Sequence, residues 1–239
     1  MKSGIGKRLL SASKLVRQGA YFADIGTDHA YLPLFLLEQG KISGAVCADI
    51  NEGPLNSAMR NAEECGLLDK ITFKLTDGAV GLSDMGITDY AICGMGGELI
   101  AKIILNSPHL KDEKVRLILQ PMSKQGYLRR MLAESGFFTV GEAYSYDAGK
   151  YYLCLAVEYD GVSRSISDLE AELGSLPTLA ELTQEQRGYL NQKLRAFEKI
   201  AKGKTEGGEE NSPEAKMLEE YKAQAEINAK KEVKERNAI

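Results

Sequence analysis

The stretch that decides the fold of this chain is residues 23–33, Ala23-Asp24-Ile25-Gly26-Thr27-Asp28-His29-Ala30-Tyr31-Leu32-Pro33. It reads as the end of a buried strand, a tight glycine turn and the start of a helix. This arrangement is typical of the first loop of an open α/β sheet, in which ligands bind where the strands end and the strand order reverses. We therefore expect this loop to contact a ligand.

The charge of the loop limits what that ligand can be. Asp24 and Asp28 flank Gly26, whereas a loop that binds a pyrophosphate exposes backbone N–H groups and keeps anions away. The dinucleotide fingerprint G-x-G-x-x-G would need glycines at positions 26, 28 and 31, but the chain has Asp28 and Tyr31 at the last two. The loop thus disfavours a nicotinamide dinucleotide and favours a ligand with hydroxyl groups and positive charge.

Acids also end the next two expected strands, residues 44–50 and 70–75. Asp49 closes the first, where an acid in an α/β nucleotide fold accepts hydrogen bonds from ribose hydroxyls. The alternative for Asp49 is a helix-capping or surface acid. Asp77 follows the second, which alternates apolar and polar residues as a half-exposed edge strand does, and it can accept the exocyclic amine of adenine. Together with Asp24 these acids predict three carboxylates at neighbouring strand ends.

A second glycine-rich turn, Gly94-Met95-Gly96-Gly97, follows the fourth expected strand, residues 88–93. Backbone without side chains can approach a flat ligand closely there. The alternative is a turn that serves only the packing of the next helix, which we expect to end near Leu105. One glycine would suffice for packing, which favours a functional turn.

The remaining elements complete one domain. Helices are expected at residues 7–18, 32–39 and 53–66, a fifth strand at 115–122, and a helix capped by Ser123 that ends near Gly136. Residues 137–144 and 151–159 predict a closing antiparallel pair. The expected fold is α/β and Rossmann-like, with a seven-stranded, mostly parallel sheet and helices on both faces, over residues 1–160.

Residues 161–239 form a predicted helical C-terminal domain, an antiparallel coiled-coil-like extension. Thr183 and Gln186 have the spacing of a capping box, and an apolar stripe follows at i, i+4, i+7 and i+11. A polar turn is expected at 203–211, and Ser212-Pro213 begins another helix. The first of these helices carries four more basic than acidic side chains. They could track phosphates or form a solvated face.

Composition sets broad limits. The net charge is −4 over 239 residues, divided equally between residues 1–160 and 161–239, so any RNA contact must come from local basic faces. No apolar run approaches the roughly 20 residues of a membrane span, which predicts a cytoplasmic protein with no membrane partner. The four cysteines show no C-x-x-C pair, and the two histidines have no zinc-site spacing, so we expect free thiols and no metal.

Several of these motifs resemble those of a known family. Residues 24–33 are similar to the first signature of the TrmK family of bacterial tRNA (adenine-N1)-methyltransferases, which act on adenine 22. Cys93 to Gly97, Gln120-Pro121-Met122, Arg8-Leu9 and Asp49 also match the family's pattern, and the resemblance covers about residues 7–160. The Asn/Asp-Pro-Pro-aromatic motif of methyltransferases that act on amino groups is absent.

The resemblance implies a class I methyltransferase that uses S-adenosyl-L-methionine (SAM) and binds tRNA, with no DNA partner and as a monomer or weak dimer. The chemistry implied is in-line displacement, with adenine N1 attacking the methyl group of the sulfonium. Since N1 is unprotonated at neutral pH, positioning supplies most of the acceleration. N1 lies on the Watson–Crick edge, so the base must be turned out of its pairing.

The expected site residues fall into two groups. The cofactor-binding set is Asp24, Gly26, Asp28, Asp49, Ile50, Asp77, Gly78, Cys93 and Gly94. The catalytic set, which orients the adenine or the methionine end of SAM, is Asp28, His29, Tyr31, Gly94, Met95, Gly96 and Gly97. The alternative for His29 is a helix-capping or core histidine. Two other functions stay open: a SAM-dependent methyltransferase of another substrate, and a non-catalytic binding protein on the same scaffold.

Overall fold

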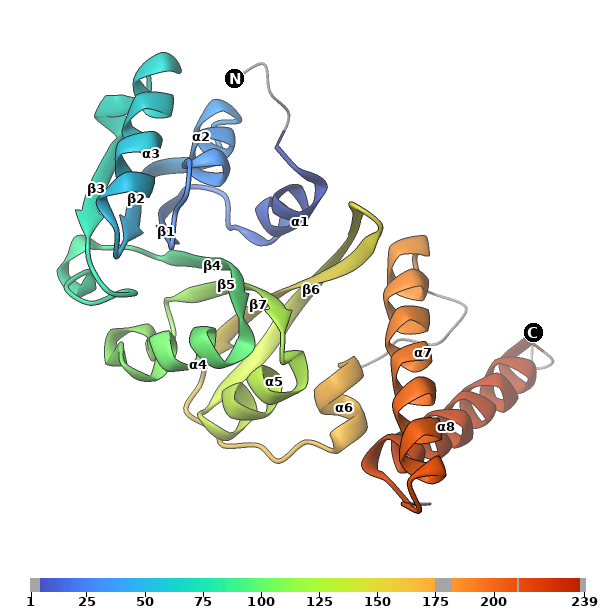
Figure 1. Ribbon diagram of the computed structural model, residues 1–239. Helices are drawn as coiled ribbons and strands as arrows, with labels where there is room; N and C mark the ends of the chain where they lie inside the picture. Colours follow the sequence, from blue (N-terminus) through green and yellow to red (C-terminus); the bar gives the residue numbers. More distant parts are fainter. Residues whose placement is uncertain (1–4, 175–181, 210, 237–239) are drawn as a thin grey trace. The chain divides into compact units, whose positions relative to one another are not determined.

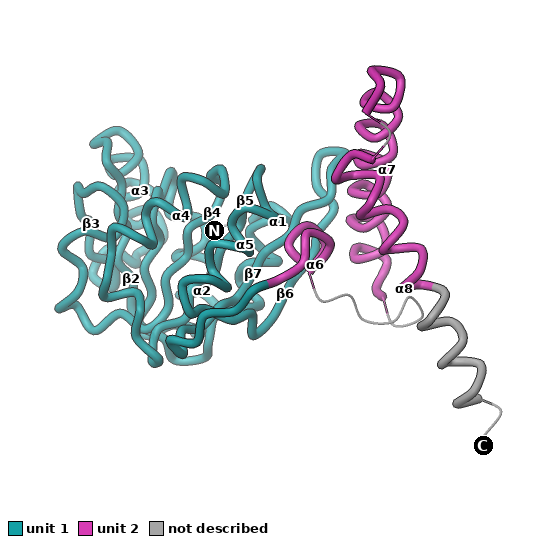
Figure 2. The backbone as a smooth tube through the Cα atoms, turned by 90° about the horizontal axis from the view of Figure 1, so that it is seen from below, with its two compact units in different colours: residues 1–165 teal, residues 166–239 magenta. Residues whose placement is uncertain are grey.

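The computed structural model describes residues 5–174, 182–209 and 211–236. The chain divides into two compact units, residues 1–165 and 166–239 (Figure 2). The boundary expected from the sequence was residue 160, and the last strand of the first unit ends at Tyr159. Parts of the predicted C-terminal domain, residues 175–181, 210 and 237–239, lie outside the described residues.

The first unit contains a seven-stranded sheet in the order β3-β2-β1-β4-β5-β7-β6 (Figure 1). Strands β1 to β5 run parallel, and β7 is antiparallel to both β5 and β6, which confirms the predicted fold class. The order reverses between β1 and β4, so the carboxyl ends of these two strands flank the expected ligand position. The strands are β1 Ala20–Ile25, β2 Ile42–Asp49, β3 Ile71–Leu75, β4 Asp89–Gly96, β5 Arg116–Ser123, β6 Phe137–Asp147 and β7 Lys150–Tyr159.

Helices cover both faces of the sheet. Those of the first half of the unit contribute to one buried core, in which Ala12, Leu34 and Ala58 pack with sheet residues such as Phe22. The next two helices pack against each other and against β4 and β5 (Figure 1). The helices are α1 Lys7–Leu15, α2 Tyr31–Glu38, α3 Glu52–Glu64, α4 Gly97–Leu105 and α5 Gln125–Glu134, with 3₁₀ turns at Leu68–Lys70, Ser83–Met85 and Pro108–Leu110.

Three local predictions were wrong. Ser123 does not cap α5: it is the last residue of β5, and Lys124, in the left-handed conformation, takes the N-cap position without a side-chain cap. The first helix ends at Leu15, because Val16 is extended. Strand β4 continues through Gly96, so the predicted glycine-rich turn is the end of a strand followed directly by α4.

The second unit contains α6 Asp168–Leu173, α7 Gln184–Glu206 and α8 Pro213–Arg236. The capping box of Thr183 and Gln186 is confirmed, since each side chain accepts a hydrogen bond from the other residue's backbone N–H. A small core joins the three helices through Leu173, Phe197 and Met217, among others. The polar turn predicted at 203–211 is wrong at its start, because α7 continues to Glu206.

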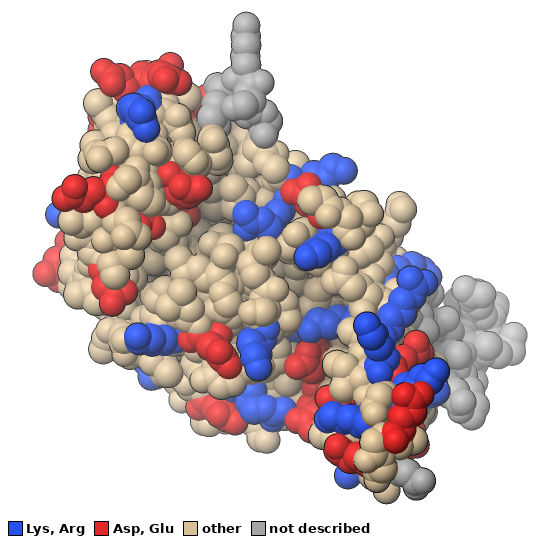
Figure 3. Space-filling model, in the orientation of Figure 1, with Lys and Arg blue, Asp and Glu red and all other residues tan. Residues whose placement is uncertain are grey.

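The basic side chains of α7 are partly neutralised. Lys193 pairs with Glu172 and Lys204 with Glu214, each at 2.9 Å. In Figure 3 basic and acidic side chains are interspersed over α7. The described residues contain no helix that is both long and apolar enough to cross a membrane.

Candidate functional site

A cavity of about 210 Å³ lies at the carboxyl ends of β1 and β4. The strand order reverses at this point, which is where an open α/β sheet binds its ligands. Six of the residues predicted to form the site line this cavity: Asp24, Gly26, Asp28, His29, Tyr31 and Cys93. The structure therefore brings together the first loop and the end of β4, which are far apart in the sequence.

The shape of the first loop depends on Gly26. Its N–H and that of Thr27 both donate to the carbonyl oxygen of Ala48, at 2.8 and 3.1 Å, which ties the turn to β2. Gly26 has φ +73°, and a Cβ there would lie 2.0 Å from the terminal methyl group of Met95. A side chain at this position would be strained by the backbone conformation, and it would also require the flexible end of Met95 to move.

Asp24 is the buried charge of the cavity. Asp24 is 9% exposed, and burial raises the pKa of its carboxyl to about 6. The buried Thr27 hydroxyl lowers this pKa and the carboxylate of Asp49 raises it. Among the described residues, no cationic side chain contributes to the shift. The carboxylate is therefore set up to gain from a positively charged ligand.

Asp28, His29 and Tyr31 form the open side of the cavity. His29 Nε2 lies 3.4 Å from Asp28 Oδ2, and the imidazole stacks on the Tyr31 ring with 5.1 Å between centroids. The backbone carbonyl of His29 accepts a hydrogen bond from Asn61, which anchors the loop to α3. His29 is 39% and Tyr31 40% exposed, so the stacked pair presents ring surface to a molecule that enters the cavity. His29 is thus neither a helix cap nor a core histidine.

The thiols around Asp24 lie in surroundings that disfavour the reactive thiolate form. Burial raises the pKa of Cys93 and of Cys47 well above the ordinary thiol value, and the charge of Asp24 raises both further. The cysteines are free, as predicted. Since the thiolate is the reactive form, covalent catalysis through these residues is disfavoured at neutral pH.

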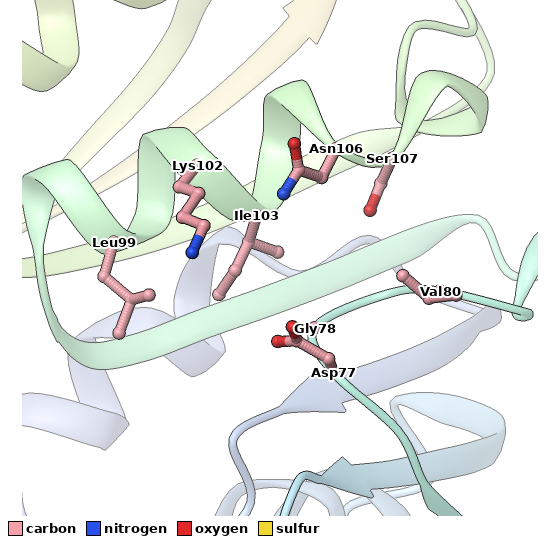
Figure 4. A pocket seen from close by; sticks show the side chains of 8 residues that line it. All are labelled: Asp77, Gly78, Val80, Leu99, Lys102, Ile103, Asn106 and Ser107. Carbon is pink, nitrogen blue, oxygen red and sulfur yellow. The ribbon is translucent and has the colours of Figure 1, made fainter.

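Asp77 and Gly78 lie apart from this cavity. They line a second, smaller hollow of about 40 Å³ against α4. In Figure 4 the side chains of Leu99, Lys102 and Ile103 point from α4 toward the loop that carries Asp77. Of the predicted cofactor-binding residues, Asp49, Ile50 and Gly94 line neither hollow. Asp49 and Ile50 follow one another at the end of β2, which lies between β1 and β3 in the sheet.

The predicted glycine turn connects the cavity to its neighbours. Gly94 has φ +80°, and its N–H donates to the side-chain oxygen of Gln120 at 3.0 Å. Met95 covers Gly26, as described above. Gly96 packs by the hydroxyl of Ser123, and a Cβ on Gly97 would lie 2.4 Å from the carbonyl oxygen of Lys124. Gly97 therefore serves close packing of two backbones, which is the alternative considered for this turn.

Sequence reasoning gave no site role to three residues that the structure places here. Arg8 and Leu9 of α1 line the cavity, and buried Gln120 hydrogen-bonds to the Arg8 guanidinium. Both Arg8-Leu9 and Gln120-Pro121-Met122 stood out only as parts of a family pattern. Positions 8 and 120 are 112 residues apart, so no local motif could have joined them.

Comparisons with known proteins agree with this geometry. The methyltransferase domain family matches residues 5–155. The tRNA (adenine(22)-N(1))-methyltransferase of Bacillus subtilis is 36% identical over 168 residues, which is 67% of this chain and 71% of the relative.

Solved structures extend the likeness over almost the whole chain. The Bacillus subtilis m1A22 tRNA methyltransferase TrmK is 27% identical, with a TM-score of 0.74 and coverage of 95% of this chain and 98% of that one. Sp1610 of Streptococcus pneumoniae, in complex with S-adenosyl-L-methionine, is 32% identical, with a TM-score of 0.77 and coverage of 90% and 100%. This chain belongs to the methyltransferase domain family and, within it, to the TrmK family.

Proposed function

We propose that this protein is a SAM-dependent tRNA (adenine(22)-N1)-methyltransferase. The observation that carries the proposal is the cavity in which the buried Asp24 carboxylate and the exposed His29–Tyr31 stack face the same space. One feature suits a cationic cofactor and the other a flat base. Membership of the TrmK family supplies the substrate class.

The residues present fit SAM. Its methionine end is a zwitterion, and the cavity holds two carboxylates, the buried Asp24 and the exposed Asp28, and one guanidinium, Arg8. We assign Asp49, at the end of β2, to the ribose hydroxyls, because a carboxylate can accept two hydrogen bonds from them. The second hollow offers apolar Leu99 and Ile103 for a ring face and the carboxylate of Asp77 for an exocyclic amine. SAM, when bound, supplies a methyl group activated by a sulfonium.

The side chains of the chain then have two tasks. Asp24 holds the ammonium group of the cofactor, so that the methyl group has a fixed position. His29 and Tyr31, with Asp28 behind the imidazole, orient the adenine so that the N1 lone pair faces that methyl group. No protein base is needed, because N1 carries no proton at neutral pH, and positioning provides the acceleration.

The acceptor must arrive unpaired, because N1 lies on the Watson–Crick edge. We place the unpaired base against the ring of Tyr31, since stacking on an aromatic side chain is a common way to hold a single base. The end of β4, Gly94 to Gly96, directly follows the cavity residue Cys93, and we assign it as the neighbouring wall for the tRNA.

The direct test is transfer of a radiolabelled methyl group from SAM to an unmodified tRNA transcript with adenine at position 22. The matched substrate carries guanine at position 22. We expect labelling of the first only, with a reverse-transcription stop at that base. Equal labelling of both transcripts would indicate another substrate, and failure to bind SAM in calorimetry would favour a non-catalytic protein.

A further inference from the structure

A buried glutamine links α1 to the end of β4 at the edge of the cavity. Gln120 on β5 is fully buried, and its Oε1 accepts hydrogen bonds both from an Arg8 Nη1 and from the N–H of Gly94. Its Nε2 lies 3.4 Å from the carbonyl oxygen of Pro121. These contacts hold the amide in one orientation, and the amide in turn fixes one nitrogen of the Arg8 guanidinium.

The rest of that guanidinium is available to the cavity. Nη1 lies against the backbone of Gly94, where a Cβ would come within 3.4 Å of it. Among the ion pairs of the described residues none includes Arg8, although Asp24 lines the same cavity. A guanidinium has five donors in a planar fork, and one edge of this fork is unused by Gln120.

We propose that Arg8 binds the α-carboxylate of the methionine end of SAM, opposite Asp24, and that Gln120 is a positioning residue that aims the guanidinium. The inference rests on the proposed function. An amino acid moiety presents one positive and one negative group. The cavity offers the carboxylates of Asp24 and Asp28 for the positive group, and the guanidinium of Arg8 for the negative one. The planar fork suits a carboxylate, which it can bind through two parallel hydrogen bonds.

A phosphate of the tRNA backbone is the competing partner for Arg8. A phosphate at this depth would share the cavity with the Asp24 carboxylate and be repelled by it. Arg8 is also only partly exposed and is held from behind by Gln120, whereas side chains that contact nucleic-acid backbones reach out into solvent. The small zwitterion fits these conditions better.

Calorimetry with two ligands tests the assignment. Decarboxylated SAM keeps the sulfonium and the ammonium group but lacks the carboxylate, so the ratio of its Kd to that of SAM measures recognition of the carboxylate alone. We expect Arg8→Met to weaken SAM binding about 30-fold, the loss typical of hydrogen bonds to a charged group, and to leave decarboxylated SAM within about twofold. Arg8→Lys restores part of the difference, because it keeps the charge but not the fork.

Gln120 and a control complete the set. Gln120→Glu keeps the shape of the side chain but pairs its own charge with Arg8, so we expect weaker SAM binding and unchanged binding of the decarboxylated form. Lys7→Met removes an exposed neighbouring charge and leaves both dissociation constants unchanged. Thermal unfolding of each variant monitors the fold.

The outcomes separate the inference from the function on which it rests. If Arg8→Met weakens both ligands equally, Arg8 does not recognise the carboxylate. If it weakens neither and reduces tRNA binding instead, the phosphate is its partner. Either result overturns the assignment while the methyltransferase function stands. Absence of SAM binding by the unaltered protein would overturn both.

Discussion

Asp24 lies near the carboxyl end of β1 and Asp77 follows the carboxyl end of β3, yet their surroundings differ sharply. Asp24 is buried in a cavity of about 210 Å³, and its pKa is raised to about 6. Asp77 is exposed, at the rim of a hollow of about 40 Å³ between its own loop and α4. A buried carboxylate without a cation destabilises the folded protein, whereas an exposed one does not.

The difference divides the work of the site. In the cavity around Asp24, the buried carboxylate is unfavourable until a cationic ligand binds next to it. This cavity therefore provides selectivity for the charged end of the cofactor. The second region offers apolar surface and an already hydrated carboxylate, so it adds shape and modest affinity. We therefore expect unequal responses to the same chemical change at the two positions.

The largest effect is expected for Asp24→Asn. Loss of the partner of the ammonium group should weaken SAM binding about 100-fold, by the loss of a buried charged pair. The ligand-free variant should nevertheless be more stable than the parent at pH 8, by up to about 3 kcal/mol, since one pKa unit corresponds to 1.36 kcal/mol. Calorimetry and urea unfolding measure the two quantities.

Asp69→Asn is the matched control for stability, because it removes an exposed acid of the same unit. It should change the free energy of unfolding by less than about 0.5 kcal/mol. A loss of stability in Asp24→Asn would contradict the inference that the buried Asp24 carboxylate lowers the free energy of unfolding.

The next largest effect is expected for His29, which lines the same cavity as Asp24. His29→Ala removes the ring that stacks on Tyr31, and we expect the single-turnover rate of methyl transfer to fall about 30-fold through misplacement of the base. SAM affinity should stay within about twofold. Tyr31→Phe retains the stacked ring and should transfer methyl groups at nearly the parental rate. Normal turnover in His29→Ala would end its assignment to the acceptor.

The pH dependence follows from the same buried acid. Below pH 6 Asp24 takes up a proton in the ligand-free protein, so the SAM affinity should be flat above pH 7 and about tenfold lower at pH 5. Binding at pH 6 should release protons, which calorimetry in buffers of different ionisation enthalpy detects. Asp24→Asn should lack this dependence.

The stability of the ligand-free protein should change in the opposite sense. The folded pKa lies above the ordinary value of 3.8, so the stabilising contribution of Asp24 is complete below pH 3.8 and is lost as the pH rises through 6. The stability difference between Asp24→Asn and the parent should therefore grow between pH 4 and 7. A constant difference would mean that the acid is not buried in solution.

A small effect is expected at the second hollow. Asp77→Asn should weaken SAM binding only about threefold, because the hydrogen bond to an exposed group exchanges with water. The unfolding free energy should not change. Were Asp77→Asn to match the loss in Asp24→Asn, the division between the two regions would fail.

The smallest effect concerns charges that are exposed on α7. Arg195 and Lys199 lie one turn apart on its surface, and replacing both with Gln should weaken tRNA binding about twofold and reduce its salt dependence. Lys202→Gln is the control, because the charge of Lys202 is already 3.9 Å from Glu206. Filter binding at two salt concentrations measures both. Unchanged binding would identify the basic face as merely solvated.

Much of the fold could be predicted because its signals are local. The apolar strands, the acids at their ends and the glycine at position 26 lie within short stretches, and the capping box at Thr183 spans four residues. The same holds for the first loop, whose residues 24–31 supply most of the cavity lining.

The remainder depends on contacts that a linear pattern does not contain. Serine is a common helix-capping residue, but the pairing of β5 with β4 extends the strand through Ser123. The role of Arg8 depends on Gln120, which only the folded sheet brings near. Asp77 follows the third strand, as the sequence predicts. The loop that carries it lies against α4, however, so Asp77 and Asp24 line different hollows.

Gly97 has a consequence for both turns at this edge of the sheet. Because Gly97 has no side chain, the start of α4 can contact the backbone between β5 and α5. A Cβ on Gly97 would lie 2.4 Å from the carbonyl oxygen of Lys124. The Lys124 carbonyl oxygen also accepts a hydrogen bond from the Leu128 N–H, and Gly96 pairs with Ser123 in the sheet. An alanine at position 97 would therefore force a shift of two backbone segments through a single methyl group.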